Sequence, residues 1–165
     1  IRDRSPSRGL GDVYKRQKHV LGYVPQDIFL LEDSIANNIA FGEGVAEIDR
    51  KRVLWALNEA QMGAFIKKQR MGIDTHVGER GVRLSGGQKQ RLGIARALYF
   101  GAKILIFDEA TSALDEATER AVMNNIAKLK NKYTLIVVAH RLSTLKVCDR
   151  IYTLSEFGLI ASELD

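Results

Sequence analysis

Two short apolar runs separated by an amphipathic stretch constrain the fold of this chain more than any other feature. The runs are Ile104–Phe107 and Leu135–Val138, and neither alternates with polar residues. Such runs are typical of strands that are buried on both faces. Residues 116–130, between them, place apolar side chains at helical spacing. This strand–helix–strand order predicts a parallel sheet and an α/β fold.

The rest of the sequence predicts further strands and helices around this unit. Leu21–Val24 reads as a short strand that stops at Pro25. The predicted helices are about 34–40, capped by Asp33 or Ser34; 50–62, capped by Asp49 and closed by Gly63; and 88–99, after a glycine-rich loop. The pair 150–154 and 159–161 is predicted to form a hairpin around Phe157 and Gly158.

Composition limits the class of protein. The chain has 165 residues, of which 45% are apolar and 27% are charged, which is the balance of one folded soluble domain. Its longest apolar runs are far shorter than the roughly 18 residues that a bilayer span needs. A single cysteine, Cys148, cannot form an internal disulfide, so a reducing compartment fits.

The net charge of +5 is a property of the first residues rather than of the whole chain. Residues 1–19 carry six basic and two acidic side chains, and the remaining residues carry nineteen and eighteen. The nearly neutral body therefore predicts no nucleic-acid partner. Residues 1–17 are rich in Arg, Ser and Gly and are predicted to be an unstructured head, either a flexible tail or a foreign stretch.

Asp108 and Glu109 directly follow the first buried run. A carboxylate at the carboxyl end of a parallel strand lies where such sheets bind ligands. Asp108 is a candidate Mg²⁺ ligand, and Glu109 is a candidate base that activates water for attack on a phosphoryl group. The alternative is that the two acids only end the strand and cap the next turn.

Three further polar signals stand at the ends of predicted elements. Ser85 is placed to cap a helix, and Gly86 and Gly87 leave its backbone N–H groups open to an anion. Gln26 follows the first strand, and His140 follows the last buried one. Taken singly, each also fits a structural role, as a plain cap, a polar loop residue or a packed histidine.

Together these segments resemble the nucleotide-binding domain of the ABC transporter family over about residues 18–155. The matching segments are Leu84–Gln88 (signature), Ile104–Asp108 with Glu109 (Walker B strand and catalytic glutamate), Ser112–Asp115 (D-loop), Gln26 (Q-loop) and His140 (H-loop). Thr75–Gly81 looks like the X-loop of exporter-type members.

The resemblance implies a P-loop NTPase-like core with an inserted helical subdomain at about 34–99, and it implies ATP and Mg²⁺ as ligands. By the same resemblance Glu109 is the general base, His140 clamps the γ-phosphate, and Asp108 and Gln26 serve Mg²⁺. Ser85, Gly86, Gly87 and Gln88 would contact ATP that a second domain holds. Asp115 would lie at the seam between the two domains.

The implied partners are a second nucleotide-binding domain, identical or not, and the transmembrane domain of the same transporter. Gln26 and Thr75–Gly81 would contact that transmembrane domain at the cytoplasmic face of the plasma (inner) membrane. The transported substrate stays open, since the membrane domain selects it.

One departure from the family pattern concerns the phosphate-binding loop. The sequence contains no Gly-x-x-x-x-Gly-Lys-Ser/Thr. We therefore expect residues 18–165 to be a partial ATPase domain, truncated at both ends and inactive alone. Two rival classes remain, a soluble ABC-type ATPase acting on ribosomes or DNA and a non-catalytic dimerising module. The neutral body and the X-loop argue against the first, and Glu109 with His140 argues against the second.

Overall fold

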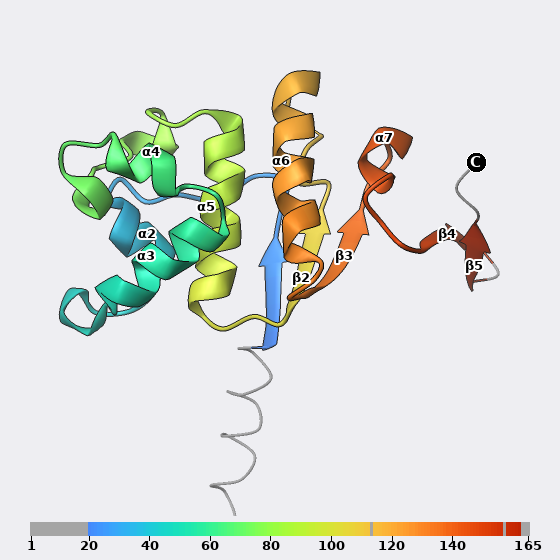
Figure 1. Ribbon diagram of the computed structural model, residues 1–165, viewed down its shortest axis with the longest axis horizontal. Coiled ribbons are helices and arrows are strands. Elements are labelled where there is room, and N and C mark those ends of the chain that lie inside the picture. Colours follow the sequence, from blue (N-terminus) through green and yellow to red (C-terminus); the bar gives the residue numbers. More distant parts are fainter. Residues whose placement is uncertain (1–19, 113, 157, 163–165) are drawn as a thin grey trace, which may run out of the picture.

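The computed structural model describes residues 20–112, 114–156 and 158–162, so the predicted head lies outside the described residues. Their centre is a parallel sheet of three strands in the order β1-β2-β3 (Figure 1). The strands are β1 (Leu21–Val24), β2 (Ile104–Asp108) and β3 (Thr134–Val138). The predicted α/β fold with a parallel sheet is confirmed.

One face of the sheet is covered by two long helices. These are α5 (Gly86–Tyr99) and α6 (Glu116–Leu129); in Figure 1 α6 lies in front of the strands and α5 stands beside β1. Val24, Leu105 and Phe107 point to this side and are almost fully buried. Burial of such side chains is the main driving force for packing the helices on the sheet.

The opposite face, which we term the open sheet face, is partly exposed. It consists of Leu21, Tyr23, Ile104, Ile106, Ile136 and Val138, which the strand register places on one side. Tyr23 is 55% exposed and Ile136 is 47% exposed. The prediction that the runs 104–107 and 135–138 are buried on both faces is therefore wrong for the second run, because no helix of the described chain covers Ile136 and Val138.

Between β1 and β2 the described chain forms helices, short 3-10 turns and one isolated bridge between Ser34 and His76. The helices before α5 are α2 (Ile35–Ile39), α3 (Arg50–Glu59) and α4 (Gly63–Lys67), and the 3-10 turns are Val45–Glu47, Gly72–Asp74 and Glu79–Gly81. Ser34 caps α2, since its hydroxyl accepts from the Asn37 N–H at 3.1 Å. A helical subdomain at 34–99 stays a prediction.

The predicted end of α3 is wrong. The helix stops at Glu59, and Gln61 takes the left-handed conformation with φ 58°, a geometry that favours glycine. Gly63 instead begins α4, where a Cβ would lie 2.2 Å from the Asn58 carbonyl oxygen Oδ1. A side chain at this position would have to displace that of Asn58, so Gly63 allows close approach and does not end the helix.

The last elements are α7 (Leu142–Leu145) and a hairpin of β4 (Ile151–Ser155) with β5 (Gly158–Ser162). The antiparallel register pairs Ser155 with Gly158, as the predicted hairpin requires, and Phe157 lies outside the described residues. Within the described ranges, every helix is too short or too polar to cross a bilayer.

Candidate functional site

Asp108 ends β2 at the carboxyl edge of the sheet. Its Oδ2 accepts a hydrogen bond at 2.6 Å from the phenol of Tyr23 on neighbouring β1. This hydrogen bond raises the pKa of Tyr23, because ionising the phenol would break it and place two negative charges together. Sequence reasoning missed Tyr23, and only the register of β1 against β2 reveals that it reaches Asp108.

Glu109 leaves strand geometry immediately after Asp108. Its φ is 48°, in the left-handed region that residues with side chains rarely adopt. Its N–H donates to the Val138 carbonyl at 3.0 Å, and its own carbonyl accepts from the N–H and the hydroxyl of Ser112, each at 2.9 Å. These three bonds hold the backbone turn that directs the carboxylate out of the sheet edge.

The carboxylate of Glu109 meets His140, which follows β3. His140 Nε2 lies 2.9 Å from Glu109 Oε1, and the imidazole is 85% exposed. The structure thus brings together two residues that lie 31 positions apart in the sequence. A carboxylate beside an exposed histidine can accept and relay a proton.

Gln26 lies just beyond β1, exposed at the same edge. Its backbone carbonyl accepts a hydrogen bond at 2.5 Å from Nε2 of Gln90, a buried residue of α5. Its side-chain amide has no hydrogen bond with any described residue and is free to meet a ligand. Sequence reasoning also missed Gln90, because a buried glutamine inside a helix carries no local signal of its partner.

The predicted signature residues form the start of α5. The hydroxyl of Ser85 accepts from the Gln88 N–H at 3.3 Å, and Gln88 Oε1 accepts from the Ser85 N–H at 2.8 Å. This reciprocal capping box fixes the first turn. The N–H groups of Gly86 and Gly87 have no acceptor among the described residues, as an anion site at a helix N-terminus requires.

The signature turn packs on the segment that leads into α6. A Cβ on Gly86 would lie 2.6 Å from a methyl of Leu114, and one on Gly87 would lie 2.7 Å from the Thr118 methyl. Asp115 caps α6, and its hydrogen bonds with Thr118 hold the pKa of its carboxyl below the usual range. Its place at a dimer seam stays a prediction.

The segment Thr75–Gly81 is tied to the helices by backbone bonds. Ile35 N–H donates to the Thr75 carbonyl, and Val77 N–H donates to the Asp33 carbonyl, both at 3.0 Å. Lys89 Nζ of α5 donates to the Arg80 carbonyl at 3.0 Å. The loop is therefore bonded to the beginning of α5, and its predicted contact with a membrane domain stays a prediction.

Two side chains at the carboxyl edge, Asp108 and Gln26, could hold a magnesium ion. Mg²⁺ binds hard oxygen ligands, commonly one or two protein groups together with phosphate oxygens. Asp108 supplies a carboxylate, and Gln26 supplies an amide oxygen without another partner in the described part of the chain. That part contains no group of three or more His, Cys, Asp or Glu residues, so the phosphates would have to complete the metal shell.

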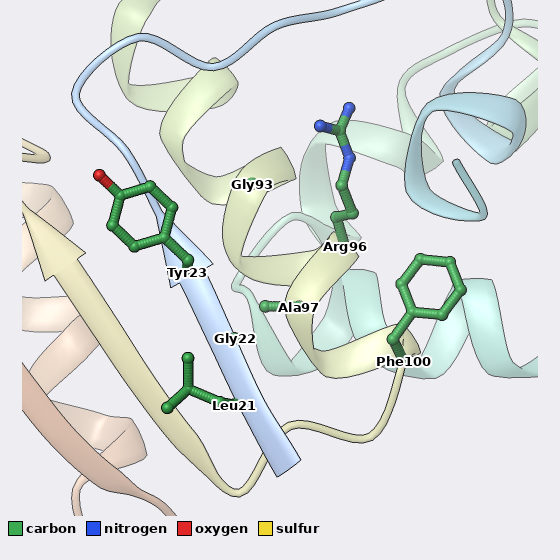
Figure 2. Close-up of a pocket in the computed structure, with 7 residues that line it drawn as sticks. All are labelled: Leu21, Gly22, Tyr23, Gly93, Arg96, Ala97 and Phe100. Atoms are coloured by element: carbon green, nitrogen blue, oxygen red, sulfur yellow. The ribbon is translucent and has the colours of Figure 1, made fainter. Parts of the chain in front are cut away.

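An open cavity of about 300 Å³ lies between β1 and α5 (Figure 2). Its lining consists of Leu21, Gly22, Tyr23, Gly93, Arg96, Ala97 and Phe100. The guanidinium of Arg96 points away from β1 and donates to the backbone carbonyls of Asn38 and Phe29. None of the residues predicted to act in catalysis lines this cavity, and Tyr23, which bonds Asp108, is the lining residue that links it to the catalytic edge.

Comparison with protein families gives a match to a family model described as ABC transporter, over residues 1–112. The ATP-dependent lipid A-core flippase of Cupriavidus pinatubonensis is 45% identical over 154 residues, which are 92% of this chain and 26% of the flippase. That of Ralstonia nicotianae is 48% identical over 141 residues, which are 85% of this chain and 24% of the flippase.

A solved structure described as a bacterial Atm1-family ABC exporter with ATP bound is also similar. It matches with a TM-score of 0.66 and 45% sequence identity, over 81% of this chain and 23% of that chain. The chain thus spans about a quarter of the length of the relatives that it matches.

Proposed function

The chain belongs to the ABC transporter family, and on that premise we propose that it forms part of the ATP-binding and ATP-hydrolysing domain of a membrane exporter. The contact between Glu109 and His140, beside Asp108, is the observation that carries the proposal. It supplies a base and a polar partner at the carboxyl edge of a parallel sheet, where phosphoryl groups bind.

In this mechanism Glu109 acts as the general base. Its Oε1 faces His140, whereas Oε2 has no partner among the described residues and can take a proton from the attacking water. The water oxygen bonds to the γ-phosphorus as the bond to the ADP oxygen breaks. His140 holds the rotamer of the base, and its exposed imidazole can turn its N–H from Glu109 to the transferring phosphoryl group when nucleotide is bound.

Asp108 and Gln26 would hold Mg²⁺ in this site. The bound ion would neutralise phosphate charge, as it does in other nucleotide hydrolases. Ser85 and Gly86 at the start of α5 are exposed, which suits contact with ATP held by a second nucleotide-binding domain. Assembly with such a domain and with transmembrane helices at the cytoplasmic face of the membrane is part of the proposal.

The relatives differ in the cargo or family that their names give. Relatives named for lipid A-core and for the Atm1 family match at the same 45% identity. In this proposal the motif residues bind and hydrolyse ATP. The relatives favour a membrane exporter over a soluble ATPase.

The test is Glu109→Gln in the intact exporter, reconstituted with lipid. We expect ATP turnover to fall by about 10²–10⁴-fold, because the amide cannot accept the proton. ATP-driven closure of the dimer, measured by trapping of labelled ATP, should persist. Glu156→Gln, at an exposed turn without contacts to the catalytic edge, is the matched control. Undiminished turnover in Glu109→Gln would remove the glutamate from the base role.

A further inference from the structure

A second carboxylate, Glu119 of α6, lies buried close to the Glu109–His140 pair. Its side chain is only 6% exposed. It accepts hydrogen bonds from Thr144 Oγ1 at 2.7 Å, from Arg141 Nη1 at 2.7 Å and from Thr111 Oγ1 at 3.3 Å. We call Thr111, Glu119, Arg141 and Thr144 the Glu119 cluster.

The members of the Glu119 cluster come from three separate segments. Thr111 belongs to the loop after β2, Glu119 to α6, and Arg141 and Thr144 to the segment after β3. A buried carboxylate is costly unless it is fully bonded. The bonds from Thr144 and then Arg141 hold the pKa of Glu119 below its usual range, so it remains charged and keeps the three donors around it.

The cluster is joined to both members of the catalytic pair. Arg141 directly follows His140, and its Nη2 donates to the Ser112 carbonyl at 3.3 Å. Ser112 in turn donates from its N–H and its hydroxyl to the Glu109 carbonyl. The cluster is therefore hydrogen-bonded through Ser112 to the backbone of Glu109, which takes a left-handed conformation. It is joined to His140 along the chain, because Arg141 is the next residue.

We propose that Glu119 is a positioning residue for ATP hydrolysis, which through Arg141 holds the segments of Glu109 and His140 at contact distance. This inference rests on the proposed function, and Glu119 itself touches no reacting atom. A carboxylate that only stabilised α6 would need no bonds to two other segments of the chain. Here all three of its donors lie outside that helix, in the segments that carry the catalytic pair.

The test replaces Glu119 by Gln in the intact exporter and measures ATPase kinetics. We expect kcat to fall by about 10- to 100-fold, because a small displacement of a base from its water is costly. The KM for ATP should change little, since Glu119 does not bind nucleotide. Glu116→Gln is the matched control, because Glu116 lies on the same helix, 82% exposed, and pairs only with Arg120. It should behave as the unmodified protein.

Arg141→Lys provides a second variant in case Glu119→Gln does not fold. The Arg141 side chain is 51% exposed, so the change leaves the core intact. Lysine keeps a charge for Glu119 but cannot also donate to the Ser112 carbonyl through a guanidinium fork. We expect a lower kcat at unchanged KM, and we expect the double variant to lose no more than the worse single variant.

A folded Glu119→Gln protein with unchanged kcat would overturn the proposal. So would a loss of thermal stability with Arg141→Lys at full kcat, because Glu119 would then serve packing alone. The outcome is separable from that for the general base. If Glu109→Gln stops turnover and Glu119→Gln does not, only the positioning role fails. If Glu109→Gln turns over normally, the proposed function fails whatever Glu119 does.

Discussion

At the scale of single residues, the phenol of Tyr23 orients a carboxylate that is a candidate metal ligand. Tyr23→Phe would remove the 2.6 Å hydrogen bond to Asp108 and leave its carboxylate free to rotate. Loss of such an orienting bond commonly weakens metal binding by about tenfold or more. We expect that loss in Mn²⁺ binding with ATP, measured by electron paramagnetic resonance on the intact exporter.

Tyr152→Phe is the control for this change, since Tyr152 is an exposed tyrosine of β4 far along the chain from the catalytic edge. Equal Mn²⁺ affinity in Tyr23→Phe and Tyr152→Phe would show that Asp108 needs no help from its neighbour.

The residues of the candidate site differ in how far the sequence reveals them. Glu109 and His140 stand at the ends of two apolar runs, so their meeting at one sheet edge could be predicted. Glu119 and Gln90 could not, because each is a polar residue inside an amphipathic helix. The partners of both residues include Arg141 and Gln26, which lie in segments whose positions depend on the packed structure.

At the scale of elements, the fit of β1 against α5 depends on Gly22. A Cβ there would lie 2.6 Å from that of Ala97 and 2.8 Å from that of Ala102. We expect Gly22→Ala to lower the free energy of unfolding of the domain by about 1–3 kcal/mol, because the strand must move away from the helix. Denaturant titration measures this change.

Gly44→Ala is the comparison for Gly22→Ala, since the nearest atom to its added methyl is Glu47 Oε2 at 3.4 Å, the far end of a flexible side chain. It should cost little. Equal denaturation midpoints for the two variants would mean that β1 and α5 are not tightly packed.

The elements themselves could be predicted where local signals agree. The strand β3 covers the predicted apolar run 135–138 with Thr134 added at its start, and Ser85 caps the predicted helix, although α5 begins two residues earlier than expected. The end of α3 could not be predicted, because the residue after the helix with a left-handed backbone conformation is Gln61, whereas glycine is the usual residue there. Tertiary contacts of α4 outweigh that local preference.

At the scale of the whole molecule, the open sheet face has the character of a surface that is normally covered. Apolar runs without alternation suit a sheet with both faces buried, yet Ile136 and Val138 are nearly half exposed in the described structure. The apolar pattern of a strand indicates which of its faces are buried, and it does not say which segment or partner buries them. For that reason the exposure of this face could not be predicted.

We expect the isolated chain to bind anilinonaphthalene sulfonate at this face, because contiguous apolar patches attract such probes. Ile136→Thr should lower the fluorescence of the bound dye. Val45→Thr, which changes a 76% exposed valine away from the sheet, should not. Fluorescence that stays the same in Ile136→Thr would place the dye elsewhere.

The hydrogen bond from Gln90 to the Gln26 carbonyl has a consequence for the order in which the two ATP sites open. Ser85 caps α5, and Gln90 lies little more than one turn further along the same helix. In the proposed dimer, Ser85 would contact the neighbour's nucleotide and Gln26 would contact the chain's own metal. Both residues are therefore attached to one rigid helix, α5. Opening at one nucleotide site would then displace residues at the other, so the two ATP sites of the dimer would open and close together.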